Sequence, residues 1–165
     1  RLKSLVYGKR TQLTICPTST KTMVEPFSFL ILNGDKPTVG EMVTSSEKWH
    51  TLDDYEDDDG IKHNVATTRN IFSKYPKILF ISFDKKSFVE IEEELILGNN
   101  VYNLKSTIIH KGIQYGGHYM SIVNQGDDWI IQDDDSLGKL SELPKEDSHY
   151  ILVYSLKTPS SECPP

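Results

Sequence analysis

With 165 residues, 37% of them hydrophobic and 10% aromatic, the chain can bury one core, which excludes general disorder. The formal net charge of −6, without a basic patch, excludes nucleic acid as an expected partner and favours a basic partner. No apolar run reaches the ~18 residues that would indicate a membrane span, so no contact with a membrane is expected.

The cysteines and the chain start indicate where such a protein works. Cys16 and Cys163 are too few and too far apart for a disulfide framework, which favours a reducing, intracellular setting, cytoplasmic or nuclear. The chain opens on Arg1 without a Met or an apolar signal segment, as expected of an internal or trimmed piece of a longer protein.

The N-terminal part of the chain predicts strands. Residues 2–15 alternate well enough for a hairpin that turns at residues 8–10, and residues 16–19 break it. A strand of high β-propensity is predicted over residues 27–32.

A helix and an acidic segment follow. Thr38 and Glu41 have the spacing of a capping box, so a short helix is predicted to run to about Trp49. Residues 53–60 hold six acids that repel one another, which predicts a solvated loop. A landing surface for a basic protein is the alternative use of that loop.

The middle of the chain is predicted to be mostly strand. A strand is predicted over residues 61–73, and the apolar run at residues 78–83 indicates a buried central strand. Residues 88–97 alternate apolar and acidic side chains, residues 98–100 turn the chain, and residues 101–110 form another strand.

Towards the C-terminus, residues 110–115 predict a glycine-bearing loop and residues 118–124 an alternating strand. A loop or short helix is predicted over residues 136–147, and residues 149–154 form the last strand of the core. Residues 159–165 are predicted to be a frayed tail, so Cys163 has no structural role.

A histidine and several acids flank the predicted hairpin turn at residues 125–128. The register set by that turn puts His118 opposite Asp135 and on the same face as Asp133, whereas Asp134 points to the other face. A carboxylate beside a histidine orients the imidazole and makes it basic for nucleophilic catalysis. A histidine near acids at a hairpin end is also common on β proteins without catalysis, so both interpretations stay open at this point.

The order of these residues resembles the histidine box of ubiquitin-specific proteases. The matching elements are, in chain order, Tyr102-x-Leu104, His110-x-Gly112, Gly116-Gly117-His118-Tyr119, Trp129, Asp133-Asp134 and Tyr150-Ile151-Leu152-Val153-Tyr154. The segment Asp84-Lys85-Lys86 departs from the family, which has Lys-Arg-Phe there. The resemblance implies an α+β, predominantly antiparallel β fold, the palm and fingers part of a papain-like cysteine protease. Residues 1–158 would be the C-terminal portion of that catalytic domain and residues 159–165 a flexible tail.

The resemblance also implies the chemistry. His118 is similar to the family's general base, Asp133 to the third member of its triad and Asp134 to an assisting acid; the match favours Asp133 over Asp135. The reaction implied is hydrolysis of the isopeptide bond after the Gly-Gly end of ubiquitin or a ubiquitin-like modifier, without a cofactor. Trp129 is expected to pack rather than react.

Substrate contacts are implied by the same match. Residues 110–117 resemble the mobile loop over the substrate's C-terminal tail, which makes His110, Gly116 and Gly117 candidates for substrate binding. Glycines suit a channel for a Gly-Gly tail because they let two backbones approach. Tyr119 either lines that channel or is structural.

Two features of the family are missing. The catalytic cysteine of the family lies N-terminal to everything seen here, so an N-terminal lobe or a partner chain would have to bring it, because neither Cys16 nor Cys163 can be assumed to meet His118. A zinc Cys-x-x-Cys often begins where Cys16 stands, but Cys16 and His63 give at most two of the four ligands that a structural zinc needs. No metal is therefore predicted, and Cys16 is expected to be an ordinary half-buried thiol.

Three functions remain open from the sequence. The chain is the C-terminal part of an active protease, or a catalytically inactive ubiquitin-binding or scaffold module, or an unrelated β-rich binding module. Retention of both His118 and Asp133 favours the first, because an inactive site needs neither.

Overall fold

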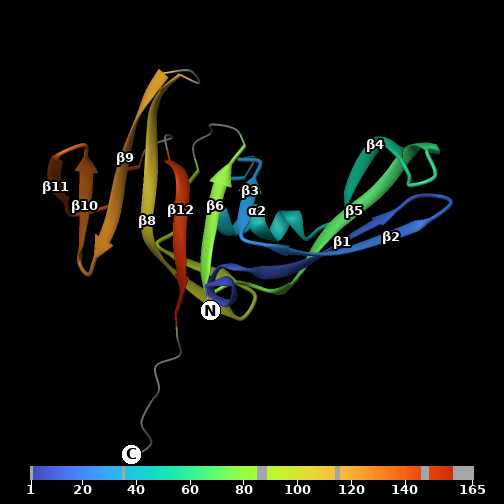
Figure 1. Ribbon diagram of the computed structural model, residues 1–165, viewed down its shortest axis with the longest axis horizontal. Helices are drawn as coiled ribbons and strands as arrows, with labels where there is room; N and C mark the ends of the chain where they lie inside the picture. The colour runs from blue at the N-terminus through green and yellow to red at the C-terminus, as the bar shows by residue number, and fades with distance from the viewer. Residues whose placement is uncertain (1, 35, 85–88, 114–115, 146–148, 158–165) are drawn as a thin grey trace, which may run out of the picture.

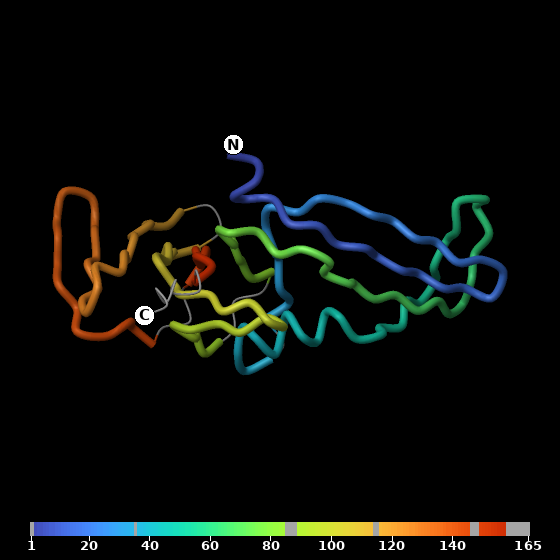
Figure 2. The backbone as a smooth tube through the Cα atoms, turned by 90° about the horizontal axis from the view of Figure 1, so that it is seen from below, coloured from blue at the N-terminus to red at the C-terminus, as the bar shows by residue number. Residues whose placement is uncertain are grey.

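Two largely antiparallel sheets lie end to end in the computed structural model of the chain (Figures 1 and 2). The structure describes every residue except 1, 35, 85–88, 114–115, 146–148 and 158–165, so the predicted tail lies outside the described residues. The predicted fold class, α+β with mostly antiparallel strands, is confirmed. Neither described helix has the length or the apolar character needed to cross a membrane.

The four-stranded sheet, called here the finger sheet, contains two hairpins side by side. Its order is β2-β1-β5-β4, with every pair antiparallel. The strands are β1 (Gly8–Ile15), β2 (Thr20–Phe27), β4 (His50–Glu56) and β5 (Lys62–Lys74).

The predicted first hairpin, with its turn at residues 8–10, is wrong. Residues Lys3–Val6 form the short helix α1, and the hairpin turn lies between Cys16 and Ser19, whose backbone groups exchange hydrogen bonds of 3.0 and 3.3 Å. Gly8 serves close packing instead of a turn, because a Cβ there would lie 2.5 Å from the Lys74 carbonyl oxygen.

The acidic stretch is also more ordered than predicted. Residues up to Glu56 belong to β4, and only residues 57–61 form a loop before β5. Pairing with β5 gives the backbone of the edge strand β4 hydrogen-bond partners on one side, while the side chains of Asp53, Asp54 and Glu56 are exposed to solvent. Repulsion between side chains therefore does not prevent a strand when each charge stays hydrated.

The eight-stranded sheet, called here the palm sheet, carries the core. Its order is β11-β10-β9-β8-β12-β6-β3, with β7 paired to β8 outside this path. Within the described residues its one parallel pair is β3 with β6. The strands are β3 (Phe29–Leu32), β6 (Ile78–Phe83), β7 (Glu94–Leu97), β8 (Asn100–Ile113), β9 (Gly116–Gln125), β10 (Asp128–Asp133), β11 (Ser136–Leu140) and β12 (His149–Leu156).

Two predictions for this sheet need correction. Residues 136–140 form strand β11 instead of a loop or helix, because the turn after Asp133 folds the chain back onto β10. The predicted strand at residues 27–32 is divided, since Phe27 ends β2 of the finger sheet and β3 begins at Phe29.

The core lies on one face of the palm sheet, under α2 (Val39–Ser46) (Figure 1). The predicted cap of this helix is confirmed, because the Thr38 side chain accepts a hydrogen bond from the Glu41 N–H at 3.2 Å. The helix buries Val39, Met42 and Val43 against the sheet. The strands contribute the buried side chains Leu30, Leu32, Leu79, Ile81, Leu95, Leu97, Tyr102, Leu104, Ile122, Trp129, Leu152 and Tyr154.

Candidate active site

His118 lies on a two-stranded ribbon that projects beyond the rest of the palm sheet (Figure 1). β8 and β9 pair as far as Ile113 and Gly116, whereas β10 pairs β9 only from Ser121 onwards and β12 pairs β8 only as far as Ile109. The predicted loop at residues 110–115 is therefore mostly strand, because cross-strand hydrogen bonds continue almost to the tip. This extension presents the imidazole at an open edge of the sheet.

The predicted register of the hairpin is confirmed. Asn124 pairs with Trp129 and Ser121 pairs with Gln132, which leaves Asp133 on the face that also carries His118. His118 Nε2 and Asp133 Oδ1 are hydrogen bonded, and both side chains are about half exposed. Hydrogen bonding and charge attraction from Asp133 raise the pKa of His118 above its ordinary value.

Asp134 was predicted to point away from His118, and this is wrong. β10 ends at Asp133, and Asp134 adopts a left-handed conformation with φ of 49° in the turn to β11. Strand alternation does not apply there, so its carboxylate comes within 4.8 Å of the ligand atoms of His118 and Asp133. Its negative charge raises the pKa of His118 further. Among the described residues no contact joins Asp135 to His118.

His110 and Tyr119 lie on the opposite face of the ribbon. Cross-strand partners share a face, and the partners are His110 with Tyr119 and Lys111 with His118. The rings of His110 and Tyr119 stack with centroids 4.5 Å apart, and Tyr150 of β12 joins them at 6.0 and 5.9 Å. Sequence reasoning placed Tyr150 in the histidine box but not in the site, because ring contacts between separate strands leave no local pattern.

The two glycines of the site serve different purposes. A Cβ on Gly117 would overlap the His110 ring, so this position requires glycine for the ring to lie flat over the backbone. A Cβ on Gly116 would meet no heavy atom within 4 Å, so its backbone is open to a ligand.

The dyad has no thiol beside it within the described part of the chain. Cys16, the described free cysteine, lies in the turn between β1 and β2. That turn is at the far end of the finger sheet from the palm sheet (Figures 1 and 2). Trp129 is 3% exposed and packs in the core, as predicted. The described residues can therefore orient and charge an imidazole, and they bring no thiol to it.

A family model described as ubiquitin carboxyl-terminal hydrolase matches residues 2–154. The chain belongs to this family. The resemblance drawn from the histidine box is thereby confirmed, and an unrelated β-rich module is excluded. The comparison with curated proteins found no match.

Three solved structures share the fold of this ubiquitin carboxyl-terminal hydrolase family member. The SAGA DUB module of Ubp8, Sgf11, Sus1 and Sgf73 bound to monoubiquitin aligns with a TM-score of 0.79 and 22% identity, over 94% of this chain and 41% of that chain. The same module bound to ubiquitin aldehyde aligns with a TM-score of 0.76 and 21% identity, over 94% of this chain and 42% of that chain. The yeast SAGA module with a mutant Sgf73 aligns with a TM-score of 0.81 and 22% identity, over 94% of this chain and 42% of that chain. The chain thus spans less than half the length of these relatives, and the likeness is one of fold.

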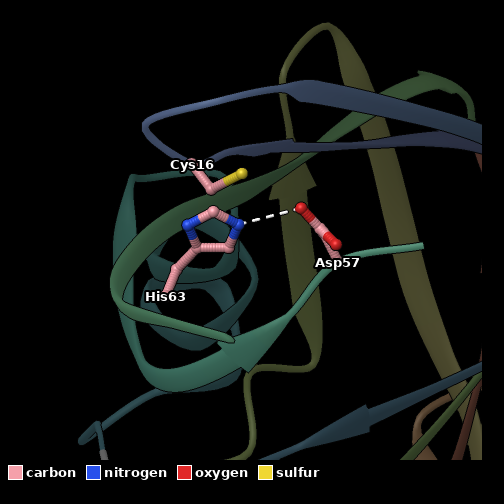
Figure 3. Close-up of side chains that lie close together, drawn as sticks. All are labelled: Cys16, Asp57 and His63. Carbon is pink, nitrogen blue, oxygen red and sulfur yellow. Dashed lines mark hydrogen bonds and ion pairs between the residues drawn. The ribbon is translucent and has the colours of Figure 1, made fainter. Parts of the chain in front are cut away.

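Two groups of side chains could hold a metal ion among the described residues. One is the exposed set His118, Asp133 and Asp134, and exposed acids gather without a metal in many proteins. The other is Cys16, Asp57 and His63 (Figure 3), where the sequence predicted at most two ligands. Cys16 is also not an ordinary half-buried thiol: it is 8% exposed, and a hydrogen bond with Ser19 is the main cause that lowers its pKa to about 7.

Proposed function

We propose that this chain is the C-terminal part of a deubiquitinating cysteine protease that hydrolyses the isopeptide bond after the Gly-Gly end of ubiquitin. His118 would be the general base and Asp133 its orienting partner, with Asp134 as a second carboxylate. The catalytic cysteine would come from a preceding segment or from a partner chain. The observation that carries the proposal is the hydrogen bond between His118 Nε2 and Asp133 Oδ1 on an exposed ribbon of a family member.

The hydrogen bond to Asp133 assigns a role to each nitrogen of the imidazole. Nε2–H donates to the carboxylate, which leaves Nδ1 as the basic atom, and no described residue hydrogen bonds Nδ1. A thiol brought to Nδ1 would lose its proton to the ring, and the raised pKa of His118 favours the resulting imidazolium and thiolate.

The remaining steps return that proton. The thiolate adds to the carbonyl carbon of the last glycine, and Nδ1–H protonates the lysine amine as the carbon–nitrogen bond breaks, which leaves a thioester. Water, deprotonated by Nδ1, then attacks the thioester and releases the ubiquitin carboxylate and the thiol. Asp133 stays ionised and holds the ring throughout.

The outer face of the palm sheet supports a second lobe as the source of the thiol. Phe29 and Ile31 of β3 and Val123 of β9 lie on the face opposite the core and are 38%, 70% and 40% exposed. Sheets with apolar side chains on both faces normally bury both faces. By strand alternation His118 lies on the other face, with the buried Met120 and Ile122, so a lobe on this outer face would have to extend around the edge of the ribbon to bring its thiol to the imidazole.

The ribbon also supports a channel for the Gly-Gly tail, formed by His110, Gly116, Gly117 and Tyr119. Gly116 leaves its backbone open for close approach, and the stacked rings of His110 and Tyr119 form a flat wall over the neighbouring Gly117, on the ribbon face opposite His118. Tyr150, which is 45% exposed, extends that wall onto β12. A tail without side chains fits against such a surface because nothing projects from it.

A catalytically inactive ubiquitin-binding or scaffold module is the alternative. A ubiquitin probe with an electrophilic C-terminus, applied to the full-length protein, separates the two. Covalent labelling that disappears in His118→Ala supports the protease, and reversible binding without labelling supports the scaffold. No interaction with ubiquitin would overturn both. Ubiquitin as partner and an intracellular location stay predictions until then.

A further inference from the structure

A cavity of about 290 Å³, called here the acidic cavity, lies between the segment before β7 and the segment that leads into β12. Its volume is at the lower limit for a small-ligand pocket, so it fits one side chain of a partner rather than a whole helix or strand. Apolar and acidic residues share its lining: Val89, Ile91 and Leu143 are apolar, and Glu90, Glu93 and Glu142 are acidic.

His149, which also lines the acidic cavity, fixes its place on the palm sheet. The residue is 8% exposed. Its Nδ1 lies 2.9 Å from the Thr107 hydroxyl oxygen on β8, and its Nε2 lies 3.0 Å from the Pro144 carbonyl oxygen. The first contact holds the ring on the core face of the sheet, and the second holds residues 142–145 beside it.

The acidic cavity and His118 lie on the same face and near the same end of the palm sheet. His149 pairs with Ile109 on β8, Ile109 pairs with Met120 on β9, and His118 lies two residues before Met120. Cross-strand partners share a face, as do residues two apart on one strand. With ~4.8 Å between strands and ~3.3 Å per residue, the Cα atoms of His149 and His118 are about 12 Å apart.

The carboxylates of the acidic cavity are available to a cation. Glu90, Glu93 and Glu142 are exposed, and no described residue forms an ion pair or a hydrogen bond with their side chains. Among the described lining residues, Lys145 supplies the one ammonium group, so negative charge is in excess.

A basic side chain fits both parts of this lining. Lys and Arg lay their aliphatic stems along apolar surface and keep the charged head in a wet, polar position. Val89 and Leu143 would contact the stem, because both are buried in the wall of the cavity, and the exposed glutamates would receive the head. An uncharged side chain gains the first contact only.

We propose that the acidic cavity binds a Lys or Arg side chain of the target protein, close in sequence to the lysine that carries ubiquitin. The inference rests on the proposed function, in which Nδ1 of His118 protonates the leaving lysine amine. The Gly-Gly tail is assigned to the opposite face of the ribbon, so the target chain continues on the face of His118, where the cavity lies. About 12 Å is spanned by three or four extended residues, which sets the expected spacing between the two basic side chains.

Cleavage of two branched substrates by the full-length protein tests the inference. Each is ubiquitin joined by an isopeptide bond to the central lysine of a fluorescent peptide, with either arginine or serine three and four positions away on both sides. Wild type is expected to cleave the arginine substrate with a kcat/KM at least ~5-fold higher, since each exposed ion pair contributes a factor of roughly 1.4–5. Arginine moved to eight positions away is expected to lose most of this preference.

Matched variants separate the acidic cavity from the overall charge of the protein. Glu93→Gln combined with Glu142→Gln is expected to lower the preference for arginine at least ~2-fold. Unchanged cleavage of the serine substrate shows that this double variant is folded. Asp54→Asn combined with Asp59→Asn removes the same charge from exposed positions of the β4–β5 hairpin and is expected to keep the full preference.

Binding measured without catalysis distinguishes a failure of the acidic cavity from a failure of the proposed function. The free arginine peptide is titrated into methyl-labelled full-length protein and followed by NMR. The methyl resonances of Val89, Ile91 and Leu143 are expected to shift in wild type, and to shift less in Glu93→Gln combined with Glu142→Gln. If neither substrate is cleaved and these methyl groups still shift, the protease proposal fails and the cavity remains a site for basic side chains.

Three outcomes overturn the inference. The first is an equal kcat/KM for the arginine and serine substrates in wild type. The second is a preference for arginine that survives Glu93→Gln combined with Glu142→Gln, or that disappears equally in the Asp54→Asn and Asp59→Asn control. The third is an arginine peptide that leaves the three methyl resonances of wild type unshifted.

Discussion

Replacing Gly117 by alanine tests whether the His110 ring fixes the shape of the ribbon that carries His118. The added Cβ overlaps the ring, which must swing away and lose its contacts with Tyr119 at 4.5 Å and Tyr150 at 6.0 Å. Each aromatic pair contributes ~0.5–1.5 kcal/mol beyond area burial, and partial exposure favours the lower half of that range. The expected loss of unfolding free energy is therefore about 1–2 kcal/mol for the two contacts.

The neighbouring glycine supplies the control. Alanine at Gly116 meets no heavy atom within 4 Å, so Gly116→Ala is expected to be neutral or to stabilise by ~0.4–1 kcal/mol through the unfolded chain. For a chain of this length, the loss in Gly117→Ala corresponds to a decrease of about 2–8 °C in Tm. Thermal unfolding followed by circular dichroism measures both variants. Equal Tm values for Gly116→Ala and Gly117→Ala would refute the assigned role of the ring.

Further predictions concern the dyad, the helix and the core. His118→Ala in the full-length protein is expected to reduce ubiquitin-probe labelling by at least ~10²-fold, the lower end for general acid–base catalysis; an unchanged labelling rate would remove His118 from the mechanism. The pKa of His118 is raised in the folded state, so its pair with Asp133 stabilises the fold below the unfolded imidazole pKa and loses this effect as pH rises through the folded value. Asp133→Asn should weaken this dependence of the unfolding free energy on pH, which urea titrations at several pH values would measure. Thr38→Ala removes the cap of α2 and is expected to cost ~0.5–2 kcal/mol in urea unfolding. Leu152→Ala empties a fully buried position and is expected to cost ~2–5 kcal/mol by the same measurement; a smaller loss would mean that the core collapses into the space.

The palm sheet could be predicted largely from the sequence because its signals are local. The hairpin register followed from the turn at residues 125–128, and β12 and β6 followed from runs of apolar and β-branched residues. Thr38 and Glu41 determined the start of α2 through one side-chain hydrogen bond. Each of these features depends on residues within a few positions of one another.

The errors arose where distant parts of the chain decide the structure. Gly8 suggests a turn, but its missing side chain makes room for the Lys74 carbonyl, which no local pattern reveals. The acids of β4 suggest a loop, but β5 supplies a strand partner. Asp134 suggests the wrong face because the strand ends one residue earlier, at Asp133.

The candidate sites divide in the same way. The dyad was predictable because His118 and Asp133 lie on adjacent strands joined by a short turn. The cluster of Cys16, Asp57 and His63 was missed because it joins two separate hairpins. Tyr150 was missed as part of the aromatic wall for a similar reason, since its ring contacts join β12 to residues of two other strands.

The most direct test of the central claim is the tautomer of His118, measured by ¹⁵N NMR of the imidazole in wild type and in Asp133→Asn. The hydrogen bond to Asp133 predicts a proton on Nε2, a basic Nδ1 and a titration midpoint above the ordinary histidine value that falls in Asp133→Asn. A proton on Nδ1 in the neutral ring, or a midpoint that does not respond to the loss of the carboxylate, would contradict the account.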